Sequence, residues 1–66
     1  MKIFINGKPH DLTGPGSLSG VIRDICPQNP YVIAELNGTL IPQDRWQGTP
    51  VEDGDHLELV SFVGGG

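Results

Sequence analysis

Only one segment of this chain has the apolar spacing of an amphipathic helix. Its apolar residues recur at i, i+3, i+4 and i+7, which places them on one helical face; they are Leu18, Val21, Ile22 and Ile25. Ser17 is a residue type that caps a helix N-terminus, and Pro27 disfavours helical geometry in the residue before it. Because one helix cannot cover both faces of a sheet, we expect a chain of 66 residues built this way to leave one sheet face at least partly open.

The rest of the chain is typical of short strands joined by turns. Asn6-Gly7 suits a type I′ turn, in which both central residues need positive φ, and it predicts a hairpin of residues 2–5 and 8–12. Pro42 confines the short strand that contains it to an edge or an end of a sheet. The other expected segments are an extended segment at 31–36, a turn at 37–39, the short strand at 40–42, a helical turn at 43–46, a turn at 52–55 and a last strand at 56–63.

The order of these segments predicts the topology. The first and last strands are apolar on both faces, which is typical of central strands. Two central terminal strands and one helix that crosses over after a hairpin describe an α+β fold of the β-grasp type. We expect a mixed sheet of four to five strands with one main helix packed on one face, in a single domain over residues 1–63. Residues 64–66 are expected to form a flexible C-terminal glycine tail.

Charge and composition exclude several classes of partner. The formal net charge is −4 and the sequence pI is about 4.7, which argues against nucleic acid and against an anionic membrane surface. No apolar run approaches the length of a membrane span, and the N-terminus lacks the apolar stretch of a secretory signal. The single cysteine cannot form an internal disulfide. We therefore expect a cytoplasmic protein that binds neither nucleic acid nor membranes and fits a partner with a basic face.

The sequence contains no constellation of catalytic residues. Cys26 is interpreted as an inert thiol rather than a nucleophile, because no base or helix N-terminus is near it in sequence. His10 and His56 are interpreted as surface residues, since a metal site usually needs three or four ligands and no spacing here supplies them. We expect no metal site and no bound cofactor. Four acidic residues near the last strand form either a solvated turn or a patch that docks onto a basic partner; they are Glu52, Asp53, Asp55 and Glu58.

The chain ends in three glycines, Gly64, Gly65 and Gly66. Such a tail lacks side chains and can thread a channel too narrow for other residues. If Gly66 is the terminus, its α-carboxylate is unhindered and becomes a good acyl group once ATP converts it to an acyl-adenylate. The alternative is a frayed tail without function.

The last strand offers a second candidate surface beside this tail. Leu57, Leu59, Ser61 and Val63 alternate with Val60 and Phe62, so the two sets lie on opposite faces. If the leucine face meets the helix, Val60 and Phe62 form an exposed apolar patch of the kind that marks protein interfaces. The alternative is that the segment around Trp46 covers both.

Three stretches of the chain match a known family: INGK near the N-terminus, IAELNGTLIPQDRW, and VEDGDHLELVSFVGGG. Through them the chain resembles, over essentially its whole length, the sulfur-carrier proteins of thiamin (thiazole) biosynthesis, which are ubiquitin-like β-grasp proteins. The helix LSGVIRDI is a looser match, because members of the family more often have a leucine-rich stretch there.

The resemblance implies a carrier, not an enzyme. An E1-like adenylating enzyme would use ATP and Mg to activate the Gly66 carboxylate, and sulfur from a cysteine desulfurase or a rhodanese-type persulfide would convert it to a thiocarboxylate. Thiazole synthase would accept that sulfur. Gly64 and Gly65 would be the tether, and Val60, Phe62 and Val63 would help to dock the partners.

Other functions share the same tail chemistry. The small subunit of molybdopterin synthase is the nearest alternative, although such chains usually run longer; carriers for cysteine synthesis or tRNA thiolation are others. A ubiquitin-like modifier of lysines and a plain interaction module with a passive tail belong to different functional classes.

Overall fold

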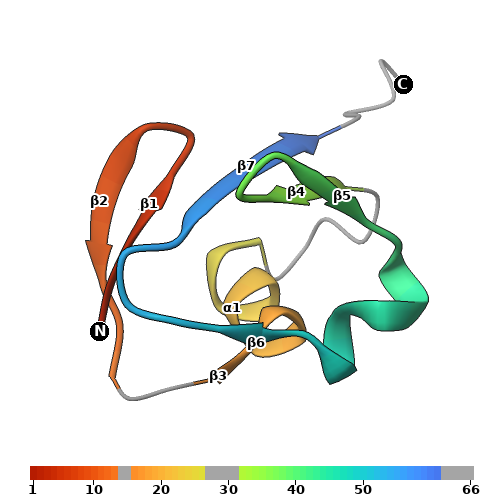
Figure 1. Cartoon of the computed structure of the whole chain (residues 1–66), viewed down its shortest axis with the longest axis horizontal. Coiled ribbons are helices and arrows are strands. Elements are labelled where there is room, and N and C mark those ends of the chain that lie inside the picture. Colours follow the sequence, from red (N-terminus) through yellow and green to blue (C-terminus); the bar gives the residue numbers. More distant parts are fainter. Residues whose placement is uncertain (14–15, 27–31, 62–66) are drawn as a thin grey trace.

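The computed structural model describes residues 1–13, 16–26 and 32–61 (Figure 1). The elements in chain order are β1 (Lys2–Ile5), β2 (Lys8–Asp11), β3 (Gly16–Ser17), α1 (Leu18–Ile25), β4 (Val32–Leu36), β5 (Thr39–Ile41), the 3-10 helix η1 (Gln43–Gly48), β6 (Pro50–Val51) and β7 (His56–Ser61). The predicted hairpin, helix and last strand are all present; β2 ends one residue before the predicted bound, and the predicted end of the last strand at residue 63 lies outside the described residues.

Five strands form one mixed sheet in the order β2-β1-β7-β4-β5. Strands β1 and β7 are parallel neighbours, and the other pairs are antiparallel. Both terminal strands therefore lie inside the sheet, as their two-sided apolar pattern predicted, and β5 lies at an edge, as Pro42 predicted. Figure 1 shows α1 lying beneath this sheet, so the predicted β-grasp topology is confirmed.

Two Asn-Gly turns connect neighbouring strands of the sheet. Asn6 and Asn37 have φ of 51° and 52°, and the glycines that follow them, Gly7 and Gly38, have φ of 82° and 84°. Positive φ at both central positions is the type I′ geometry that matches the twist of a hairpin. The Asn-Gly pairs thus set where β1 turns into β2 and where β4 turns into β5.

Helix α1 begins and ends at the predicted signals. The Gly20 N–H donates to the Ser17 hydroxyl oxygen at 3.2 Å, which satisfies one of the free donors at the N-terminus. At the other end the Cys26 N–H donates to the Ile22 carbonyl at 2.7 Å. Leu18, Val21 and Ile22 are buried, so the apolar stripe is the face that packs on the sheet.

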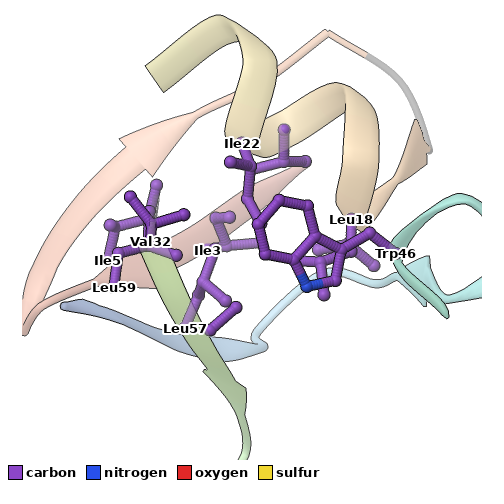
Figure 2. Packing of buried hydrophobic residues seen from close by; sticks show 11 residues of the cluster. Ile3, Ile5, Leu18, Ile22, Val32, Trp46, Leu57 and Leu59 are labelled. Carbon is purple, nitrogen blue, oxygen red and sulfur yellow. The ribbon is translucent and has the colours of Figure 1, made fainter. Parts of the chain in front are cut away.

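The core lies between α1 and one face of the sheet. It joins the helix to alternate residues of β1, β4 and β7; its buried members are Ile3, Ile5, Leu18, Val21, Ile22, Val32, Ala34, Trp46, Val51, Leu57 and Leu59. Figure 2 shows the Trp46 indole within this cluster beside Ile22 and Leu18. The indole N–H donates to the Ile41 carbonyl at 2.9 Å, so the polar atom of this buried ring has a partner.

One small feature has no counterpart in the sequence analysis. Strands β3 and β6 form a second, two-stranded sheet in which Gly16 pairs with Val51 and Ser17 with Pro50. Next to it, the Leu18 N–H donates to the Thr49 carbonyl at 2.8 Å. These contacts attach the start of α1 to the segment after η1. In addition, η1 extends over six residues, beyond the single helical turn expected at 43–46.

Candidate functional site

Strand β7 separates the two faces of the sheet as its alternation predicted. Leu57 and Leu59 are buried in the core, whereas His56, Glu58 and Val60 are exposed. The alternative in which the Trp46 segment covers Val60 is wrong, because Trp46 packs on the helix side and Val60 is 53% exposed. Phe62 and Val63 lie outside the described residues, so their docking role stays a prediction.

Val60 belongs to an apolar patch that crosses three neighbouring strands. It is opposite Ile33 of β4, which is 37% exposed. Leu40 of β5 is 55% exposed and is opposite Glu35. Because Glu35 lies two residues after Ile33 on β4, Leu40 is a diagonal neighbour of Ile33. Ile33 and Leu40 were not predicted from the sequence, because only the strand order and register place Ile33 beside Val60 and Leu40 on the next strand, diagonal to Ile33. We call Ile33, Leu40 and Val60 the open-face patch.

Two acidic residues lie next to this patch. Glu35 and Glu58 are direct partners across β4 and β7, and both are exposed. Like charges directly opposite each other on antiparallel strands are destabilising. The two carboxylates therefore form an acidic rim beside the open-face patch.

The other end of the open face has a different character. The rings of Phe4 and His56, from the parallel strands β1 and β7, stack with centroids 4.7 Å apart and an angle of 14° between the planes. Phe4 is thereby half-buried on a face that the helix does not cover. The open-face patch therefore lies toward the end of β7 that leads to the glycines, while the stacked pair occupies its start.

The acidic side chains before β7 differ in the hydrogen bonds that they form within the protein. The Asp53 carboxylate accepts from the Lys2 N–H at 2.7 Å, and the Asp55 carboxylate accepts from the Glu52 N–H at 2.8 Å. Asp55 also accepts from the Asn37 side-chain amide at 3.0 Å. These two aspartates shape the turn. Glu52, Asp53 and Glu58 are exposed and Asp55 is half-buried, and whether the four residues dock a basic partner stays a prediction.

The remaining candidates do not gather into a site. His10 lies on the edge strand β2 opposite Ile3, and Cys26 is half-buried at the end of α1. Within the described ranges, no group of three His, Cys, Asp or Glu side chains is arranged to hold a metal ion. Among the helices that the structure describes, none has the length and apolar character needed to cross a bilayer. Gly64, Gly65 and Gly66, the predicted tail, lie outside the described residues.

The parallel central pair β1 and β7, the crossover helix on one face and the exposed opposite face define a ubiquitin-like β-grasp protein. The model of the ThiS family matches residues 3–66, and the chain belongs to this family. A crystal structure of the thiamine biosynthesis protein ThiS from Geobacter metallireducens has a TM-score of 0.84 and 33% identity, with 100% of both chains covered.

Two relatives differ in how much of their length this chain represents. The uncharacterized protein ycf40 of Pyropia yezoensis is 35% identical over 66 residues, which make up 93% of that protein. A thiazole synthase of Paramagnetospirillum magneticum is 30% identical over 66 residues, and there the chain spans only 20% of the relative. The matched segment thus corresponds to nearly a whole protein in one case and to one fifth of a polypeptide in the other.

Proposed function

We propose that this protein is a sulfur carrier of thiamin biosynthesis, in which Gly66 bears the sulfur as a thiocarboxylate. The observation that supports this most strongly is the ThiS family match, which extends through residue 66 and so includes all three glycines. The similarity to the ThiS crystal structure from Geobacter metallireducens, which covers both chains completely, agrees with it. In this proposal the protein acts as a co-substrate of other enzymes.

The proposed reaction begins with activation by an E1-like adenylating enzyme. The Gly66 carboxylate attacks the α-phosphate of ATP and releases pyrophosphate, with Mg bound by the activating enzyme. The terminal sulfur of a persulfide on a cysteine desulfurase or a rhodanese-type donor then attacks the acyl-adenylate and releases AMP. A second thiol of the donor reduces the resulting acyl disulfide, forms a protein disulfide and leaves the thiocarboxylate. The carrier itself needs no cofactor.

The open-face patch is the proposed docking surface for these enzymes. Val60, together with Phe62 and Val63 further along the chain, would place the partner beside the tail. Exposed apolar side chains with an acidic rim suit a partner that has an apolar contact zone and basic residues around it. Residues 64–66 would then extend from the docked domain into the active site, a reach of roughly 10 Å.

Thiazole synthase is the proposed acceptor of the sulfur. The thiazole synthase of Paramagnetospirillum magneticum contains a segment similar to this entire chain within its own polypeptide. A carrier-like segment joined to a thiazole synthase supports a partnership between the two. It favours this acceptor over molybdopterin synthase, cysteine synthesis and tRNA thiolation.

The test is the intact mass of the protein after incubation with the E1-like adenylating enzyme of the source organism, ATP, Mg and a persulfide donor. We expect a gain that corresponds to replacement of one oxygen by sulfur, mapped to Gly66 by fragmentation. Deletion of Gly65 and Gly66 serves as the control and should abolish the gain. An unchanged mass, with an enzyme that consumes ATP and a donor that releases sulfur, would contradict the proposal.

The two rival classes give different results in simple assays. A ubiquitin-like modifier would form isopeptide conjugates, visible as a ladder of higher masses in extracts probed for this chain. A passive interaction module would retain its function after deletion of Gly65 and Gly66, whereas a sulfur carrier would lose it completely.

A further inference from the structure

The side chain of Asn6 makes two hydrogen bonds to the main chain of β7. Its Oδ1 accepts from the Leu59 N–H at 2.8 Å, and its Nδ2 donates to the Leu59 carbonyl at 3.2 Å. The Asn6 main-chain N–H also donates to the Leu57 carbonyl at 2.9 Å. One residue of the β1–β2 turn thus holds β7 at two successive positions on the same edge.

The Asn6 carboxamide forms hydrogen bonds to β7 at a position where the main chain of a longer β1 would otherwise pair with it. Strand β1 pairs with β7 at Phe4↔His56 and Ile5↔Leu57. A longer parallel strand would next offer a main-chain carbonyl to the Leu59 N–H. At Asn6 the main chain turns with φ of 51°, and the side-chain oxygen accepts that hydrogen bond instead. Asn is one of the few residue types with side-chain hydrogen-bonding groups that also tolerates this conformation.

The position that Asn6 holds is close to the reactive end of the chain. Leu59 is buried, pairs with Ala34 of β4 on its other side and lies five positions before Gly64. Asn6 therefore holds β7 at Leu59 on the β1 edge, while β4 pairs with β7 on the other edge as far as Ser61, where the described part of β7 ends. A strand held from both sides has a defined register and direction at this point.

We propose that Asn6 is a positioning residue: its carboxamide holds the β1 edge of β7 at Leu59, beyond the last β1–β7 pair, and so steers the direction in which β7 leads toward the Gly66 carboxylate that the activating enzyme must receive. This inference rests on the proposed function. Loss of the two hydrogen bonds would leave docking intact, because Asn6 is not part of the open-face patch. It would lower the rate of the bound complex, since small misplacements of a reacting group reduce rates strongly.

The chain supplies a matched control in Asn37. It has the same conformation in the other Asn-Gly turn, and its Oδ1 accepts from the His56 N–H at 2.9 Å. Its Nδ2 donates to Asp55, and both contacts lie at the start of β7, away from the tail. Asn6→Gly and Asn37→Gly each remove one carboxamide, and glycine keeps the positive φ without strain. Asn6→Gly should lose somewhat more stability, because the hydrogen bonds of Asn6 to Leu59 are part-buried and those of Asn37 are exposed, and only Asn6→Gly should affect the tail.

The experiment measures ATP-dependent pyrophosphate release by the E1-like adenylating enzyme at varied concentrations of each full-length variant. We expect kcat for Asn6→Gly to fall roughly tenfold, with KM within about twofold of wild type. Both constants should stay within about twofold for Asn37→Gly. Hydrogen exchange of the Leu59 amide, followed in the protein alone, should be faster in Asn6→Gly and unchanged in Asn37→Gly.

Each other outcome overturns the inference. Equal kcat for wild type and Asn6→Gly would do so, as would an equal loss of kcat in the two glycine variants, which would indicate a general effect of stability. If Asn6→Gly does not fold, Asn6→Asp replaces it: this variant keeps the acceptor for the Leu59 N–H, loses the donor to the carbonyl and should also lower kcat. Absence of pyrophosphate release with the wild-type chain would overturn the proposed function itself, and is thereby distinguished from failure of this inference.

Discussion

The two faces of the five-stranded sheet are made from the same strands but have opposite properties. On the helix side, Leu57, Leu59 and Ala34 are buried in a continuous core. On the other side, Val60 and Ile33 come from the same two strands and remain exposed. A domain of this size has one helix with which to cover apolar surface, so apolar residues on the second face do not add to the core. They remain available for a partner.

Along the single strand β7, side chains that contribute to the stability of the core alternate with side chains that are available for recognition. Within β7, Leu57 and Leu59 are buried in the core, whereas Glu58 and Val60 between and beyond them are exposed. Substitutions at adjacent residues should therefore have different measurable consequences.

The largest expected difference is between two leucines on opposite faces. Leu57→Ala leaves a cavity in the core and should lower the free energy of unfolding by about 3 kcal/mol. Leu40→Ala, at a side chain that is 55% exposed, should change it by less than about 0.5 kcal/mol. Chemical denaturation of both variants provides the measurement. Similar losses would show that the open face is part of the folding core.

The next effect concerns partner binding on the open face. Val60→Ala and Phe62→Ala should each weaken binding to the adenylating enzyme by about 1 kcal/mol, because truncated apolar anchors lose contact area in the complex. Titration calorimetry gives the affinities, and the melting temperature should stay close to that of wild type. Gln47→Ala, at an exposed position on the helix side, is the control. Wild-type affinity for both variants would contradict a role of Val60 and Phe62 in docking.

A smaller effect is expected within the helix. Gly20→Ala should stabilise the domain by about 0.5 to 1 kcal/mol, since alanine favours a helix over glycine. A Cβ at this position would meet the Ser17 Oγ at 3.6 Å, an ordinary contact. Thermal unfolding would show the gain, and affinity for the adenylating enzyme should not change. Destabilisation would mean that the N-terminal turn of α1 does not tolerate a side chain there.

The smallest effect tests the acidic rim. Glu35→Gln removes the like-charge pair with Glu58 and should raise the free energy of unfolding by about 0.3 kcal/mol. The same change should weaken binding to a basic partner face and reduce the dependence of that binding on salt. Opposite signs for stability and affinity would identify the rim as a recognition feature. A variant that is more stable and binds equally well would contradict that role.

The sequence predicted those features that depend on local chemistry. The Asn-Gly pairs located two hairpin turns, the apolar spacing with Ser17 located the helix, and the two-sided apolar pattern placed β1 and β7 inside the sheet. Alternation along β7 also separated Val60 from Leu59. Each of these signals lies within a few neighbouring residues.

What could not be predicted depends on register between distant segments. Nothing in the sequence of β4 and β5 indicates that Ile33 lies beside Val60, that Leu40 is diagonal to Ile33, or that Glu35 is opposite Glu58. The position of Trp46 on the helix side was left open for the same reason. Strands β3 and β6 have two residues each, too few for any periodic pattern. The hydrogen bonds of Asn6 to Leu59 span 53 positions in the sequence.

The decisive measurement for the proposed function is a single-turnover transfer of isotopically labelled sulfur. The carrier is first loaded at Gly66, purified, and then mixed with thiazole synthase and the remaining thiazole precursors. We predict that the label appears in the thiazole product at the rate at which it leaves the carrier. Retention of the label on the carrier with a thiazole synthase that accepts sulfur from another donor would contradict the account.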